Sequence, residues 1–112
     1  MTTNLEPLNQ RINAADQRIR EHVRQTYLEY SPVLSGLCAG NVYCKLENLQ
    51  HTGSFKLRGA FNKVLSLTEA ERHNGIVTSS SGNHGAGVAY VLNALKQSGT
   101  VYVPNNVVPE KA

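Results

Sequence analysis

The sequence predicts an α/β fold in which helices connect the strands of a small parallel sheet. Helical and strand-like patterns alternate along the chain, and the strand candidates are short and rich in residues that favour β structure. Strands separated by helices need crossover connections, which give parallel pairing. The 112 residues amount to at most one ordinary domain. Because parallel sheets are covered on both faces and usually continue further, we expect a truncated, N-terminal portion of a larger α/β domain.

The first 30 residues are expected to form a helix and a lead-in to the α/β core. One apolar residue recurs every three or four positions, which is the spacing of one face of a helix. This face comprises Leu5, Leu8, Ile12, Ala15, Ile19 and Val23. Ser31 precedes Pro32, and a residue before proline is pushed away from helical geometry, so the chain should be extended there. We therefore place the start of the α/β core at residues 31–112.

A strand and a helix are expected next. Residues 42–47 are rich in β-formers, and residues 48–53 are polar and predict a loop. Ser54 is placed to cap the helix that follows, since a serine hydroxyl can accept from free N–H groups of the first turn. The apolar face of this helix is expected to comprise Phe55, Ala60, Val64 and Leu65.

The remaining elements complete the alternation of helices and strands. Thr68 and Glu71 have the spacing of a capping box, which predicts a short helix over 68–72. The other elements are a strand at 75–78, a turn of small residues at 79–85, a helix through Leu95 and a strand at 100–103.

Composition and charge argue against several classes of protein. The net charge of +3 is mild and the basic residues are scattered, without the aromatic interleaving of a nucleic-acid-binding surface. No apolar run approaches the roughly 20 residues needed to cross a bilayer, and the N-terminus lacks the pattern of a signal peptide, so we expect a cytoplasmic protein. Cys38 and Cys44 do not form a CxxC motif, which favours reduced, buried thiols and no metal site.

Lys56 is the first candidate for chemistry. With Ser54 as the cap, Lys56 and Arg58 would lie in the first turn, where the helix dipole disfavours positive charge by about 0.3–1 kcal/mol per residue. Such a pair indicates either an anion nearby or a lysine kept neutral, and a neutral amine can attack an aldehyde to form a Schiff base. The alternative is an ordinary solvated lysine.

Residues 79–85 are the second candidate, a serine- and glycine-rich turn between a strand and a helix. Backbone N–H groups and hydroxyls converge in such a turn, which suits a carboxylate or a phosphate. Gly82 and Gly85 would let the backbone approach the ligand closely. The spacing of Gly82, Gly85 and Gly87 does not match the dinucleotide fingerprint, and the alternative is a turn that binds nothing.

Taken together, residues 54–60 (SFKLRGA) and 80–85 (SSGNHG) resemble the fold-type II pyridoxal phosphate enzymes, which are tryptophan synthase β-like. The similarity is to the serine/threonine dehydratase and serine racemase branch, and it covers roughly residues 30–110. It implies pyridoxal 5′-phosphate as cofactor and the conversion of L-serine or L-threonine to a 2-oxo acid and ammonia. A serine racemase is the alternative within the branch. A non-catalytic anion-binding α/β module is the alternative from another class.

The resemblance also implies roles for individual residues. Lys56 would hold the cofactor as a Schiff base and remove the substrate α-proton. Phe55 would lie against the cofactor ring, and Asn83 would hydrogen-bond the ring hydroxyl. Ser81 corresponds to the serine that acts on the opposite face in racemases. The substrate α-carboxylate would be bound by Ser80, Ser81, Asn83 and His84.

Two features of the family are not found in the 112 residues. Its glycine-rich phosphate loop and the residue that faces the pyridine nitrogen lie further along a longer chain. We therefore predict that this polypeptide alone binds pyridoxal phosphate weakly and turns over little or nothing. The resemblance also implies a homodimer for the full-length form.

Overall fold

The computed structural model describes residues 7–105, which fold into helices and short strands as an α/β protein should. The α-helices in this range are α1 (Leu8–Ile19), α2 (Pro32–Cys38), α3 (Lys56–Ser66), α4 (Glu69–His73) and α5 (Asn83–Ala94). The strands are β1 (Leu28–Tyr30), β2 (Tyr43–Lys45), β3 (Ile76–Ser79) and β4 (Gly99–Tyr102), and a 3-10 turn covers Glu47–Leu49. The predicted α/β class is thus confirmed.

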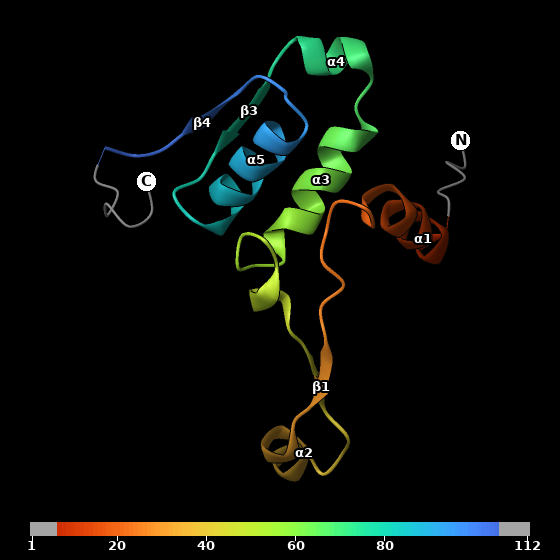
Figure 1. Cartoon of the computed structure of the whole chain (residues 1–112). Helices are drawn as coiled ribbons and strands as arrows, with labels where there is room; N and C mark the ends of the chain where they lie inside the picture. The colour runs from red at the N-terminus through yellow and green to blue at the C-terminus, as the bar shows by residue number, and fades with distance from the viewer. Residues whose placement is uncertain (1–6, 106–112) are drawn as a thin grey trace, which may run out of the picture.

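The body of the molecule consists of α1, α3, α5 and the β3–β4 sheet. Helix α5 lies between α3 and the sheet, and α1 lies against the other side of α3 (Figure 1). Leu57, Phe61 and Val91 are at most 1% exposed at the α3–α5 interface. Ile19 at the end of α1 joins the same core. Full burial of each such side chain stabilises the fold by roughly 1.5–3 kcal/mol, so this interface is its main source of stability.

The buried face of α3 differs in part from the predicted one. Ala60 and Val64 are buried as expected, but Phe55 lies before the helix and is 60% exposed. Leu57 and Phe61 take the central positions instead. The helix begins at residue 56 rather than near Ser54, and this places Leu57 and not Phe55 against α5.

Helix α1 is shorter than the apolar pattern predicts. It ends at Ile19, so Val23 lies in the following loop, and Leu5 lies outside the described residues. Leu8 and Ile12 are exposed. The reason is that α1 packs on α3 near its C-terminal end, where Arg18 donates a hydrogen bond to the Asn62 side chain.

The sheet topology corrects a further expectation. Strands β3 and β4 pair in parallel, with Ile76 opposite Gly99, which agrees with the predicted crossover through α5. The strand predicted at 42–47 does not join this sheet: β2 pairs antiparallel with β1, with Leu28 opposite Lys45. The sequence analysis did not predict β1. Pairing with a segment so close in the chain costs less closure entropy than a distant parallel partner.

Residues 28–45 form what we call the arm, which extends away from the body (Figure 1). Ser31 is extended, as predicted, but it caps a helix: its hydroxyl accepts from the Leu34 N–H at 3.3 Å, and Pro32 occupies the first turn of α2.

Both cysteines are free, but Cys38 is exposed and Cys44 only half-buried, so the expectation of buried thiols was wrong. The apolar side chains of α2 are exposed, and the thiol of Cys38 at the end of this helix is exposed with them.

The capping box of α4 is confirmed. The Thr68 hydroxyl accepts from the Glu71 N–H at 3.3 Å, and the Glu71 carboxylate accepts from the Thr68 N–H at 2.8 Å. Helix α5 ends at Ala94, and Lys96 adopts a positive φ of 52° where the chain turns toward β4. Within residues 7–105, every helix is too short or too polar to cross a bilayer.

Candidate active site

The turn between β3 and α5 is the first part of the candidate site. The Ser80 hydroxyl accepts from the Gly82 N–H at 3.2 Å, and Gly82 is the N-cap of α5 without a side-chain hydrogen bond. The first turn of α5 therefore presents backbone N–H groups that no side chain caps, at the positive end of the helix dipole. Ser80 and Ser81 are half-buried, whereas Asn83 and His84 are exposed. This arrangement can bind a carboxylate or another anion.

Gly85 lets this turn pack onto its own helix. A Cβ atom at residue 85 would lie 2.4 Å from the carbonyl oxygen of Ser80 and 3.3 Å from the Val101 side chain. The sequence analysis expected Gly82 and Gly85 to give a ligand access to the backbone. At Gly85 the close approach is instead to the protein's own backbone, and at Gly82 no heavy atom lies within 4 Å of the Cβ position.

Gly87 brings the two candidate segments together. A Cβ atom there would lie 3.4 Å from the Leu57 nitrogen and 3.4 Å from the Lys56 carbonyl carbon, so α5 lies directly against the start of α3. Gly87 is four residues after Asn83, which is about 6 Å along the helix axis at 1.5 Å per residue. The backbone of Lys56 is therefore about one turn from the anion-binding end of α5. A glycine inside a helix costs about 1 kcal/mol relative to alanine, so Gly87 is itself a sequence signal of close packing at this point.

The start of α3 differs from the prediction. Phe55 is the N-cap and already has helical dihedrals (φ −67°, ψ −14°), so Ser54 does not cap the helix. The hydroxyl oxygens of Ser54 and Thr52 are instead buried, with no hydrogen-bond partner in the described part of the chain. Buried hydroxyls are usually paired, and an unpaired one costs roughly 1–3 kcal/mol. The segment that precedes Lys56 in the chain thus carries two buried polar atoms without partners in the described residues.

Lys56 is exposed, and its Nζ lies 4.8 Å from the centroid of the Phe55 ring. Neither of the ion pairs formed within residues 7–105 includes Lys56. The amine therefore has no carboxylate partner within those residues, and it remains accessible to an incoming carbonyl group.

Arg58, in the same turn, has an anion within the protein. Its Nε and Nη2 donate to the two oxygens of the Glu47 carboxylate, each at 2.8 Å, and the Thr26 hydroxyl donates to the same carboxylate at 2.7 Å. The hydrogen bond from Arg58 lowers the pKa of Glu47 against the opposing effect of desolvation, and the bond to Glu47 raises the pKa of Arg58. Glu47 had not been singled out. A contact between residues eleven apart in different elements leaves no periodic signal.

Comparisons with known proteins identify the family of this chain. Residues 19–112 match the family model described as pyridoxal-phosphate dependent enzyme, and the chain belongs to this family. Pyridoxal phosphate is the cofactor of this class.

The relatives with similar sequence are threonine dehydratases. The chain is 45% identical over 93 residues to the L-threonine ammonia-lyase of Thermotoga maritima, covering 83% of this chain and 23% of that protein. It is 42% identical over 97 residues to the catabolic L-threonine dehydratase TdcB of Escherichia coli K12, covering 87% and 30%.

Among solved structures, the chain is similar to the serine racemase of Dictyostelium discoideum, with a TM-score of 0.85 and 38% identity over 91% of this chain and 34% of that one. The chain spans between a quarter and a third of the length of such relatives.

Proposed function

We propose that this chain supplies the lysine and the carboxylate-binding turn of a pyridoxal-phosphate dependent ammonia-lyase, which converts L-threonine or L-serine to a 2-oxo acid and ammonia. The observation that carries the proposal is the contact of Gly87 with the backbone of Lys56 and Leu57. That contact brings the backbone of Lys56 to about one helical turn from the N-terminus of α5, which supports the proposal because an α-amino acid substrate needs both an amine and a carboxylate-binding group. The names of the relatives favour a small hydroxy amino acid as the substrate.

The residues at the start of α3 fit the cofactor. Lys56 would hold it covalently through Nζ, and Phe55, whose ring is exposed beside that atom, would lie against the pyridine ring. The unpaired hydroxyls of Thr52 and Ser54 are donors and acceptors for which a bound polar group would provide partners. Bound pyridoxal phosphate supplies an electron sink for the charge that develops at the substrate α-carbon.

The first turn of α5 would orient the substrate. The side chains of Ser80, Ser81, Asn83 and His84 lie at or just before this turn in the sequence and would bind the α-carboxylate, with Asn83 also reaching the ring hydroxyl of the cofactor. With the carboxylate held there, the amine of Lys56 would take the α-proton of the substrate.

Three further statements belong to this proposal. The division into a lead-in (1–30) and the start of the catalytic core (31–112) stays a prediction, as do the cytoplasmic location and a homodimeric full-length form.

The experiment is a chimera in which this chain replaces the matching quarter of the Thermotoga maritima L-threonine ammonia-lyase. We expect 2-oxo acid formation from L-threonine, and a loss of roughly 10²–10⁴-fold in kcat for Lys56→Ala, the range of an essential acid–base group. Lys63→Ala removes an exposed lysine from the same helix and should change kcat little. Activity that survives Lys56→Ala would contradict the proposal.

Serine racemization is the second candidate, because the similar solved structures include serine racemases and a serine occupies position 81. If it operates, Ser81→Ala in the chimera should stop the formation of D-serine from L-serine while the 2-oxo acid still forms. If D-serine never forms, this candidate is wrong and the lyase remains.

A non-catalytic anion-binding module is the alternative from another class. Incubation of the 112-residue chain with pyridoxal phosphate and borohydride, followed by peptide mass spectrometry, separates it from an enzyme. Selective labelling of Lys56 over Lys63 supports the enzyme. Labelling of all exposed lysines to the same extent supports the module, since simple anion binding does not need the amine of Lys56.

A further inference from the structure

A pocket that we call the basic pocket lies outside the candidate active site. It has a volume of about 630 Å³ and is formed where the end of α1 and the loop after it meet β2 and α3. This size is typical of sites for small molecules. The charged side chains that line it are Arg20, Arg24, Lys45, Arg58, Asp16 and Glu21. None of the residues proposed for the active site lines it.

Two cationic side chains of the basic pocket, Arg24 and Lys45, are each held by a hydrogen bond to a backbone carbonyl. Arg24 Nη1 donates to the Leu49 carbonyl at 3.1 Å, and Lys45 Nζ donates to the Thr26 carbonyl. Neither side chain forms an ion pair with a carboxylate of residues 7–105. A carbonyl uses one N–H group and leaves the full charge and the remaining donors free, two on the lysine and up to four on the arginine.

The backbone that carries Arg24 is itself fixed. The side chain of Gln50, which is 3% exposed, accepts from the Arg24 N–H at 3.1 Å and donates to the Arg24 carbonyl at 2.6 Å. Both main-chain polar groups of Arg24 are thus bound by one buried amide. Because the position is fixed in advance, less conformational entropy is lost when its guanidinium binds a ligand.

The other two cations already have acidic partners. Arg20 pairs with Asp16 at 2.5 Å, and Arg58 pairs with Glu47. With these two pairs offset and Glu21 opposing Arg24 and Lys45, the four cations and the three carboxylates of Asp16, Glu21 and Glu47 leave a net charge of +1. We infer that the basic pocket binds a dianionic phosphate group, free or as the phosphomonoester of a small molecule, with Arg24 and Lys45 as its main ligands. Both are strong donors to phosphate oxygens.

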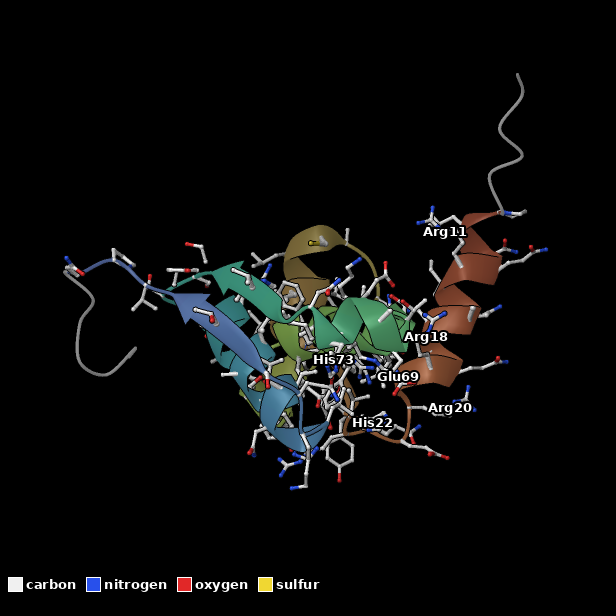
Figure 2. All side chains as sticks on the ribbon, turned by 90° about the horizontal axis from the view of Figure 1, so that it is seen from above. Arg11, Arg18, Arg20, His22, Glu69 and His73 are labelled. Atoms are coloured by element: carbon white, nitrogen blue, oxygen red, sulfur yellow. The ribbon has the colours of Figure 1, made fainter. Side chains whose placement is uncertain are left out.

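The test is a titration of the 112-residue chain with inorganic phosphate at pH 8 and constant ionic strength, followed by NMR of the arginine and lysine side chains. We expect saturable binding that weakens about tenfold or more in the Arg24→Met/Lys45→Met double variant, as for the loss of charge-assisted hydrogen bonds. Arg11→Met is the control, since Arg11 lies toward the opposite end of α1 from Arg20 (Figure 2). It should weaken binding less than twofold.

A gain of affinity distinguishes the site from a folding defect. Glu21 lines the pocket and makes no side-chain hydrogen bond or ion pair within the described residues, so Glu21→Gln removes a repulsive charge without breaking a contact. Phosphate should then bind about threefold more tightly, as for one charge across a partly solvated pocket. Non-saturable binding, an equal loss in Arg11→Met and the double variant, or no gain in Glu21→Gln would each overturn the inference. Acetate binding as tight as phosphate would overturn the dianion assignment.

Discussion

The body and the arm of this molecule are ordered by different interactions. In the body, Leu57, Phe61 and Val91 are almost completely buried between α3 and α5. In the arm, the apolar side chains of Val33 and Leu37 are 73% and 78% exposed. Apolar burial therefore stabilises the body, whereas the arm depends on the β1–β2 pairing and on polar contacts at its base. The candidate active site lies in the body, where packing fixes the backbone.

The largest expected effect is on the core of the body. Phe61→Ala leaves a cavity between α3 and α5 and should lower the free energy of unfolding by about 3–5 kcal/mol. Leu37→Ala in the arm removes a side chain that is already in solvent, and it should change stability by no more than about 0.5 kcal/mol. Urea denaturation followed by circular dichroism measures both. Equal losses would mean that the arm is buried in solution.

Glycine gives a sharper comparison, because the same substitution should have opposite effects in the two regions. Gly85→Ala forces a Cβ atom against the Ser80 carbonyl and should destabilise the body by about 1–3 kcal/mol. Gly36→Ala lies within α2 with nothing inside 4 Å of its Cβ, so the helix propensity of alanine should stabilise the arm by about 0.5–1 kcal/mol. Thermal melts of the two variants test the signs. A stabilised Gly85→Ala would show that the turn does not pack on α5 as described.

The polar contacts at the base of the arm should give a smaller effect. Glu47→Gln weakens the bonds from Arg58 and Thr26, and the loss of a charged partner in a half-buried network costs roughly 1–3 kcal/mol. Asp16→Asn removes the exposed pair with Arg20 and should cost no more than about 1 kcal/mol. Denaturation midpoints at neutral pH compare the two. A larger loss for Asp16→Asn would contradict this ranking.

The same carboxylate predicts a pH dependence. The pKa of Glu47 is lowered in the folded protein from an ordinary value of 4.5, chiefly by its hydrogen bond from Arg58. A lowered pKa means that the unfolded state binds more protons in acid, so the contribution is fully present above about 4.5 and is lost as the pH falls through the folded value. Glu71, whose pKa is lowered by the Thr68 N–H, contributes with the same sign. Unfolding measured at pH 6 and pH 3 should therefore show a smaller acid loss in Glu47→Gln than in the parent chain.

The predictions from the sequence were correct where an element depends on contacts within a few residues, and wrong where it depends on contacts between residues far apart in the chain. The capping box of Thr68 and Glu71 was predicted correctly because it lies within one turn of helix. The strand at 42–47 was placed in the wrong sheet, because its partner is chosen by tertiary contacts that periodicity does not show. Ser54 has the residue type of a cap, but its hydroxyl is buried and unpaired. A preference for a type of residue does not determine where a helix begins.

The sequence by itself determined the α/β class, the order of most elements and the two segments that carry Lys56 and residues 80–85, since these depend on local patterns and on residue types with few chemical uses. Only the tertiary structure decided that the two segments meet, through the packing of Gly87 on the start of α3. It also decided that Arg58 pairs with Glu47 while Lys56 forms no ion pair within residues 7–105. Contacts between residues far apart in the chain form only when the whole chain has packed, so local sequence patterns do not predict them.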